Sequence, residues 1–282
     1  MAAAEATVAG TSGSLAPLQN IWVKELHRME WGLAPLGDAM FDAARLSPGE
    51  RVLDVGCGGG TTTMEAARRV GSRGRAVGLD ITRPLLKVAR KRTVEAGIDN
   101  VEFVEADAQT YPFEEGTFDV LISRHGTMFF DDPDAAFVNL GRAVRAGGRI
   151  SIVCPQDPLT SEWIAVAVGA AIPHVGAPDL GAPGAPGPFV FAEPARLTQA
   201  LEAGGFRDIA VEGLVRPVPI GSDVDDVVEY VTLLPQSQTL IAGQPERRVA
   251  AAIAALREAL VPFMRDGRVV MNDSAWLATA RR

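Results

Sequence analysis

The sequence predicts an α/β protein with a mainly parallel sheet that is covered by helices on both faces. Short apolar segments of strand length alternate with segments of helical periodicity through the first half of the chain. The strand segments are apolar throughout, as strands buried on both faces are. With 282 residues, of which 47% are hydrophobic, the chain is long enough for one large core and a small cap.

The first half contains five predicted strands, at residues 51–55, 74–80, 101–107, 118–124 and 149–154. A helix is predicted before the first strand, at 33–45, and helices are predicted between the strands at 61–71, 82–97 and 131–148. Thr82 and Asp132 are residues that cap helix starts, each close to a proline, and Gly71, Gly97 and Gly147 are residues at which helices end. We expect the core that holds a ligand to span residues 33–155, preceded by an arm and a covering helix in residues 1–32.

The second half is expected to combine a cap with closing strands of the same sheet over residues 156–282. Residues 173–189 are rich in Pro and Gly and predict a long loop, in which His174 would be exposed. A helix at 193–206 and a strand at 207–218 follow. Helices are predicted at 222–235 and 245–264, and residues 275–282 are expected to form a closing edge strand.

The composition argues against several classes of partner. A net charge of −8 disfavours nucleic acid and anionic membrane surfaces, and the run "RKR" at 90–92 is interpreted as a solvated helix face. The longest apolar run, at 163–172, is too short to span a bilayer, and the N-terminus lacks the pattern of a secretory signal. Two cysteines, Cys57 and Cys154, form no disulfide framework, so we expect a reduced, cytoplasmic protein.

A glycine-rich turn, "VLDVGCGGG" at 52–60, follows the first predicted strand. Such a turn lies at the carboxyl edge of a parallel sheet, where small molecules bind. Its spacing is Gly56-x-Gly58-x-Gly60 with Thr61 next, which fits a nicotinamide fingerprint poorly. Asp54 would be badly placed beside a pyrophosphate but suits a ligand that carries an ammonium group.

Acids also end the second and third predicted strands. A carboxylate at the position of Asp80 can accept both hydroxyls of a ribose. Asp107 and the adjacent amide of Ala108 could contact an adenine edge, with Ile81 on the purine face. Three acids at three strand ends are less easily explained as solvated caps than one.

In this order, the segments "VLDVGCGGG", "VGLDI", "EADAQTYPF", "FDVLISR" and "RAVRAGGRISIVCP" resemble the class I S-adenosylmethionine-dependent methyltransferases. The nearest group is the bacterial ubiquinone/menaquinone-biosynthesis-like branch that acts on small molecules. The resemblance implies a Rossmann-like, seven-stranded sheet whose last strand is antiparallel, and S-adenosylmethionine as cofactor with no metal. It implies cofactor contacts at Asp54, Gly56, Cys57, Gly58, Gly60, Asp80, Ile81, Asp107, Ala108 and Ser123.

His125 follows the fourth strand, at the edge where a transferred methyl group would emerge, and is the candidate catalytic base. Two alternatives stay open: a polar contact that lines the pocket, or a loop histidine without a role. The segment 20–32 resembles the helix that covers the cofactor in this family. From it we take Trp22, His27 and Trp31, and from the cap Tyr230, as substrate-pocket candidates; ordinary packing is the alternative for each.

The resemblance implies transfer of a methyl group by in-line displacement to a small, mostly apolar metabolite, either a natural product or a quinone-like acceptor. The expected protein is a monomer or homodimer. One alternative is an enzyme on the same scaffold that uses the bound cofactor without methyl transfer, in a cyclisation or decarboxylation. A non-catalytic cofactor-binding subunit is the other alternative, whereas Thr61 and Asp54 disfavour a dehydrogenase.

Overall fold

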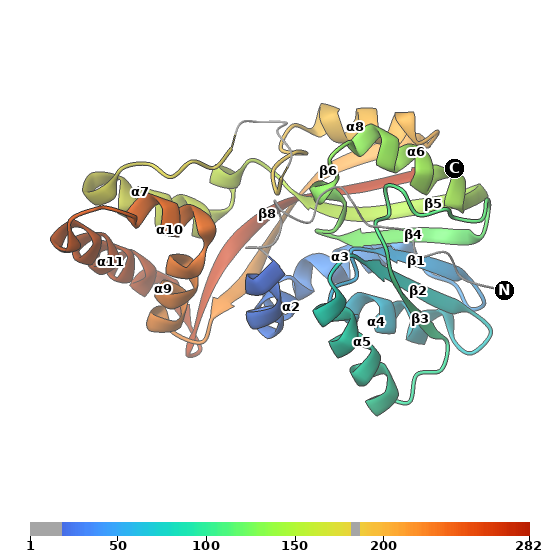
Figure 1. The fold of residues 1–282 in the computed structure, drawn as a ribbon, viewed down its shortest axis with the longest axis horizontal. Coiled ribbons are helices and arrows are strands. Elements are labelled where there is room, and N and C mark those ends of the chain that lie inside the picture. Colours follow the sequence, from blue (N-terminus) through green and yellow to red (C-terminus); the bar gives the residue numbers. More distant parts are fainter. Residues whose placement is uncertain (1–18, 182–186) are drawn as a thin grey trace.

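The computed structural model describes residues 19–181 and 187–282, so the predicted N-terminal arm and the centre of the Pro/Gly segment lie outside the described residues. Its sheet has the strand order β3-β2-β1-β4-β5-β8-β6, with β7 paired to β8 (Figure 1). Strands β1 to β5 are parallel, whereas β8 runs antiparallel to β5, β6 and β7. The bounds are Arg51–Val55 (β1), Arg75–Asp80 (β2), Val101–Glu105 (β3), Phe118–Arg124 (β4), Val144–Pro155 (β5), Arg207–Gly221 (β6), Met264–Arg265 (β7) and Arg268–Arg281 (β8). The predicted mainly parallel sheet is confirmed.

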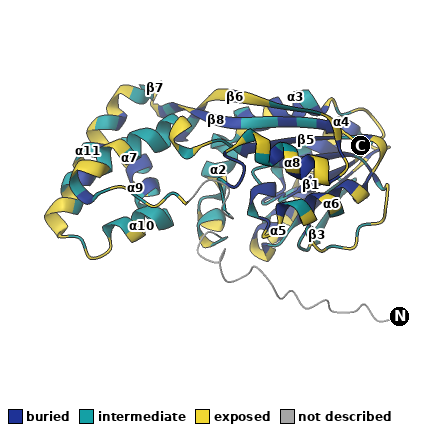
Figure 2. Ribbon diagram, turned by 90° about the horizontal axis from the view of Figure 1, so that it is seen from above, coloured by how far each residue is buried: buried dark blue, intermediate teal, exposed yellow. Residues whose placement is uncertain are grey.

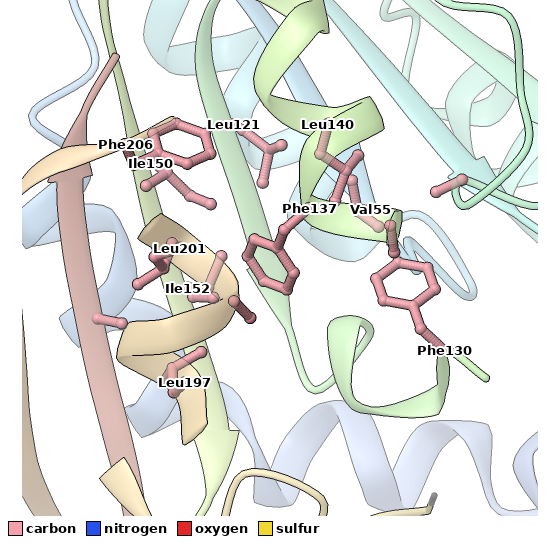
Figure 3. Packing of buried hydrophobic residues seen from close by; sticks show 14 of the residues in the cluster. Val55, Leu121, Phe130, Phe137, Leu140, Ile150, Ile152, Leu197, Leu201 and Phe206 are labelled. Carbon is pink, nitrogen blue, oxygen red and sulfur yellow. The ribbon is translucent and has the colours of Figure 1, made fainter. Parts of the chain in front are cut away.

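Helices cover both faces of this sheet (Figure 1). On one side lie α3 (Ala34–Ala44), α4 (Thr61–Val70) and α5 (Arg83–Glu95); on the other lie α6 (Pro133–Ala143) and α8 (Pro194–Ala203). Successive strand residues point to opposite faces of the sheet, so Val52 packs with α3 and α4 on one face, while Leu53 packs with α6 and α8 on the other. Figure 3 shows the second layer, where Phe137 and Leu201 meet strand residues such as Ile152. This two-sided burial is why the strand sequences are apolar without alternation.

A helical cap sits at the far end of β6 and β8, beyond the parallel strands (Figures 1 and 2). It consists of α7 (Glu162–Val175), α9 (Val224–Leu233), α10 (Pro235–Ile241) and α11 (Glu246–Leu260). A short 3₁₀ turn at Val261–Phe263 follows α11, and two others lie at Thr127–Phe129 and Pro158–Thr160. The cap has its own apolar cluster, in which Val227, Leu256 and Met271 are buried. Residues 19–24 are helical and lead into α2 (Leu26–Gly32), which lies between the cap and the sheet (Figure 1).

Some predicted boundaries were wrong. The helix predicted at 222–235 is found as α9, and a second helix that the sequence analysis did not predict, α10, begins at Pro235. Leu234 is extended between the two, since a residue that precedes proline disfavours the helical region. The helix predicted to reach residue 148 ends at Ala143, where β5 begins. Residues 275–282 belong to β8, which lies between β5 and β6 rather than at the sheet edge. His174 lies in the last turn of α7 and is half-buried.

Among the described residues, no helix combines the length and apolar character needed to cross a membrane.

Candidate functional site

The glycine-rich turn and the loop after β4 meet backbone to backbone at the carboxyl end of the sheet. A side chain at Gly56 would place its Cβ 2.5 Å from the Cα of Gly126, and a Cβ on Gly126 would lie 2.2 Å from the carbonyl oxygen of Val55. Gly56 also has a φ of 71°, in the left-handed region. Glycine is therefore required on both loops, and their close contact leaves backbone as one wall of a cavity.

Asp80 ties the glycine-rich turn to the end of β2. Its Oδ2 accepts a hydrogen bond from the backbone N–H of Gly58 and its Oδ1 accepts one from that of Thr82, each at 2.8 Å. Burial raises the pKa of this carboxyl above its usual value, and the two backbone hydrogen bonds oppose that rise. Each carboxylate oxygen has further acceptor capacity, so Asp80 can hold the turn and still accept from a ligand.

A cavity of about 190 Å³ opens along this edge. The predicted cofactor residues that line it are Gly56, Cys57, Gly58, Asp80, Ile81, Asp107 and Ala108. We call it the first cavity. Asp107 accepts a hydrogen bond at Oδ1 from the backbone N–H of Gln109 (2.8 Å), which sets its carboxylate at the cavity wall. Three parallel strands thus bring residues distant in sequence to one site.

Asp54, Gly60 and Ser123 are also predicted cofactor residues, but they do not line the first cavity. Asp54 is fully buried under the turn, and its Oδ2 accepts from the hydroxyls of Thr62 (2.6 Å) and Thr63 (2.7 Å). Gly60 begins α4, where a Cβ would lie 2.8 Å from the side chains of α5 and β3.

Ser123 supports the loop contact from below. Its hydroxyl donates to the carbonyl oxygen of Val55 (2.7 Å) and accepts from the backbone N–H of Gly126 (3.2 Å). Its side chain is fully buried. The three residues outside the cavity wall therefore hold the turn and the adjoining loop in place.

Helix α2 covers the glycine-rich turn through Glu30. Glu30 Oε1 accepts from the hydroxyl of Thr61 (2.6 Å), and the Arg92 guanidinium donates to both oxygens of Glu30 (2.7 and 2.9 Å). The same guanidinium reaches the carbonyl of Gly59 (3.3 Å). The prediction that Arg92 belongs to a solvated helix face was therefore wrong. Glu30 lines the first cavity, so this contact joins the cover to the turn below it.

The three substrate-pocket candidates of the N-terminal segment differ in whether they line the first cavity. Trp22 lies 5.0 Å from Phe129 between ring centroids and lines the cavity. His27 is exposed, and Trp31 packs under the guanidinium of Arg268 at 5.4 Å; neither is in the lining of the first cavity or of the second cavity described below. The sequence analysis missed the pairing of Glu30 with Arg92, which are 62 positions apart; no local pattern signals it.

His125 stands at the end of β4 with a left-handed φ of 58°, which is unusual for a residue with a side chain. Its backbone N–H donates to the carbonyl of Val153 (2.9 Å). Within the described part of the chain, Nε2 is buried without a hydrogen-bond partner. Burial lowers the pKa of His125 to about 3, and the positive charge of Arg124 adds to this. The imidazole is therefore neutral at neutral pH, with Nε2 able to accept or donate a hydrogen bond according to its tautomer.

A second cavity, of about 320 Å³, lies under the cap and is mostly apolar. Side chains of α7, α9, α10 and α11 line it together with the extended ends of β6 and β8, and Tyr230 is among them. The residues that line both cavities are Trp22, Met29, Leu33, His125, Met128 and Phe129. The two cavities therefore share one wall, and His125 belongs to it.

Within the described ranges, no group of three or more His, Cys, Asp and Glu side chains is arranged to hold a metal ion.

Residues 46–171 match the family model described as "Methyltransferase domain". The nocamycin O-methyltransferase of Saccharothrix syringae is 32% identical over 184 residues, which are 62% of this chain and 65% of that protein. A ubiquinone/menaquinone biosynthesis C-methyltransferase of Teredinibacter turnerae is 39% identical over 115 residues, which are 40% of this chain and 46% of that protein. The chain thus spans between about half and two thirds of the length of these relatives.

Solved structures extend the likeness to the rest of the fold. A phosphoethanolamine N-methyltransferase 2 of Haemonchus contortus, in complex with phosphomonomethylethanolamine and S-adenosylhomocysteine, superposes with a TM-score of 0.59 at 19% identity. The match covers 97% of this chain and 60% of that one. The glycine-rich turn and the strand-end acids of residues 54–108 fall inside the segment that the family model matches. Residues 46–171 therefore match a methyltransferase domain, and the chain shares the fold of this solved methyltransferase.

Proposed function

We propose that this protein binds S-adenosylmethionine in the first cavity and transfers its methyl group to a small, mostly apolar acceptor in the second. The observation that carries the proposal is the wall common to the two cavities, which includes His125, Trp22 and Phe129. A methyl donor and an acceptor must meet at one point, and these cavities adjoin at the end of β4. The family match of residues 46–171 supports the same reaction.

The first cavity suits the proposed cofactor. Gly56 and Gly58 present backbone rather than side chains, so the methionine portion can approach the turn closely. Asp80 would accept the ribose hydroxyls through its remaining lone pairs, and Asp107 with the amide of Ala108 would contact the adenine edge. Ile81 supplies an apolar surface for the purine face. When bound, this cofactor supplies a methyl group already activated on a sulfonium.

The protein's own contribution is then orientation and exclusion of water. Orientation of two reactants can account for about 7–11 kcal/mol of a barrier. Trp22 and Phe129 close the common wall with aromatic surface, and the pairing of Glu30 with Arg92 holds the covering helix on the turn. These contacts support a site that is assembled before the acceptor arrives.

His125 would act on the acceptor as a neutral group. A pKa near 3 makes the imidazole a weak base, so we assign it the orientation of an acceptor hydroxyl or amine through Nε2 rather than full proton abstraction. A neutral side chain at this position also avoids a second positive charge beside a sulfonium. The left-handed backbone of His125 holds the ring in the common wall.

The names of two relatives suggest a class of acceptor. One is named for an O-methyltransfer in nocamycin and the other for a C-methyltransfer in quinone biosynthesis. The second cavity, with its predominantly apolar lining, suits such skeletons, so we propose a natural-product or quinone-like acceptor.

The test combines binding and turnover. Calorimetry should show S-adenosylhomocysteine binding about tenfold more tightly than its 2′-deoxyribose analogue, because the analogue lacks one hydroxyl that would donate a hydrogen bond to Asp80. The purified protein with S-adenosylmethionine should release S-adenosylhomocysteine and methylated product only with an acceptor present. Equal affinity for the two ligands would remove the ribose assignment. Conversion of an acceptor without methyl transfer would instead support the alternative use of the cofactor.

A further inference from the structure

One carboxylate in the second cavity has no cationic partner. Asp273 of β8 is 9% exposed, and its Oδ1 accepts from the hydroxyl of Ser161 (2.5 Å) and the backbone N–H of Ser274 (3.0 Å). Among the described residues, no basic side chain pairs with this carboxylate, although the side chain of Trp163 also hydrogen-bonds it. Asp273 lines the cavity, and a carboxylate can accept about four hydrogen bonds, so it retains acceptor capacity for a ligand there. A buried carboxylate without a cation to neutralise its charge is costly, so its retention requires an explanation.

Two aromatic side chains stand beside this carboxylate in a mostly apolar enclosure whose lining also includes Arg28. Trp163 and Tyr230 line the same cavity, with ring centroids 6.3 Å apart. Burial is the main cause of a raised pKa at Tyr230, and the charges of Glu25 and Asp273 add to it, which places Asp273 near the phenol. Aromatic rings next to a carboxylate form an environment that favours the binding of an organic cation.

The fixed charges nearby are predominantly negative. Arg28 hydrogen-bonds Asp226 and Glu25 and lies 4.9 Å from the centre of the Tyr230 ring. Its single positive charge is thus outnumbered by these two carboxylates, and Asp273 adds a third. Lys24 Nζ lies 3.9 Å from a carboxylate oxygen of Glu229, and both side chains are exposed, so this pair adds no net charge. The excess of negative charge favours a cationic ligand group over a neutral one.

The sheet register sets the distance between this group and the common wall. Leu277 of β8 pairs with Val153, the residue whose carbonyl accepts from the backbone of His125. Asp273 lies four residues farther along β8 toward the cap, about 13 Å at about 3.3 Å per residue, and the end of β4 lies two strands from β8, about 10 Å at about 4.8 Å per strand. The backbones of Asp273 and His125 are therefore about 16 Å apart. A ligand that reaches from one to the other needs a skeleton of about two or three rings.

We infer that Asp273, with Trp163 and Tyr230, is a specificity site that binds a protonated amine on the acceptor, at the end remote from the atom that receives the methyl group. The site selects acceptors with an apolar skeleton of two or three rings and a basic nitrogen. This rests on the proposed function only in calling the ligand an acceptor. Binding at Asp273 itself does not depend on methyl transfer.

The test uses three probes that share a two-ring skeleton and differ at one end: 2-(2-naphthyl)ethylamine, 2-(2-naphthyl)ethanol and 2-ethylnaphthalene. Equilibrium dialysis of the full chain should show the amine binding at least about tenfold more tightly than the ethyl compound, because only the ammonium can pair with Asp273. Asp273→Asn should abolish most of this preference and leave the ethyl compound unchanged. Glu258→Gln, which removes an exposed carboxylate of α11 outside the lining of the cavity, should preserve it.

The outcomes separate the two proposals. If the ethanol or ethyl probe binds the unaltered protein as well as the amine does, the amine assignment is overturned, and this measurement needs no variant to fold. Equal loss of all three probes in Asp273→Asn would show a structural role and also overturn it. Each titration is repeated with S-adenosylhomocysteine, whose own binding is measured separately. If that ligand fails to bind while the amine preference stands, the proposed function fails and the amine site survives.

Discussion

The buried acid beneath the glycine-rich turn makes a quantitative prediction about stability. Asp54 is fully buried, and burial raises its pKa from 3.8 to about 6, against the hydroxyls of Thr62 and Thr63 and the charge of Arg124. Because the folded-state value is the higher one, the folded protein holds this proton more tightly than the unfolded chain. The stabilisation by Asp54 is therefore present below the unfolded value and is lost as the pH rises through about 6.

The magnitude follows from the difference between the two pKa values. A shift of about 2.2 units corresponds to about 3 kcal/mol in all, at about 1.36 kcal/mol per unit. About 1.4 kcal/mol of this falls between pH 7.5 and pH 5, a range in which unfolding is convenient to measure. Asp54→Asn removes the titrating group and keeps an oxygen for the two threonine hydroxyls.

The assay is urea unfolding of the natural protein and the variant at several pH values. The stability of the natural protein relative to Asp54→Asn should rise by about 1.4 kcal/mol as the pH falls from 7.5 to 5. Asp42→Asn, which removes an exposed carboxylate of α3, controls for the loss of one negative charge. A difference that stays constant with pH, or that grows toward high pH, would refute the account of Asp54.

Two further predictions concern the loops and the covering helix. In urea unfolding, Gly126→Ala should lower the free energy of unfolding by about 3 kcal/mol, because its Cβ would lie 2.2 Å from a β1 carbonyl oxygen. Gly169→Ala, inside α7, is the control: its Cβ would meet nothing within 4 Å, so it should raise the free energy of unfolding by about 1 kcal/mol. Similar effects of the two would contradict the contact between the loops. Glu30→Gln should weaken S-adenosylhomocysteine binding by about three- to tenfold in calorimetry, since it breaks the pairing with Arg92; Glu65→Gln, on the exposed side of α4, should leave it unchanged. Unaltered affinity in Glu30→Gln would mean that the cover does not contribute to the site.

The sheet core was predictable because its determinants are local and periodic. Apolar runs such as 118–124 and capped helices such as α6, where Asp132 accepts from the backbone N–H of Ala135, need no knowledge of distant residues. The position of β8 between β5 and β6 was not predictable from residues 275–282, because an apolar strand of the same composition suits an interior or an edge position. The strands that pair with β8, rather than the sequence of β8 itself, determine its position in the sheet.

The candidate site divides in the same way. The residues that line the first cavity from the turn and the strand ends were found from their place in the sequence, since parallel strands bring their carboxyl ends to one edge. The pairing of Glu30 with Arg92 was not found, because nothing near either residue signals the other. Asp273 was missed as well, since an acid in a strand is ordinary until its burial is known.

By itself, the sequence determined the α/β class, the glycine-rich turn and the acids that end the first strands, because hydrophobic periodicity and turn chemistry act over a few residues. Only the tertiary structure decided that two cavities share a wall at His125 and that a carboxylate without a cationic partner lies in the second. Those features depend on segments more than a hundred residues apart, and their contacts arise from packing that no local pattern encodes.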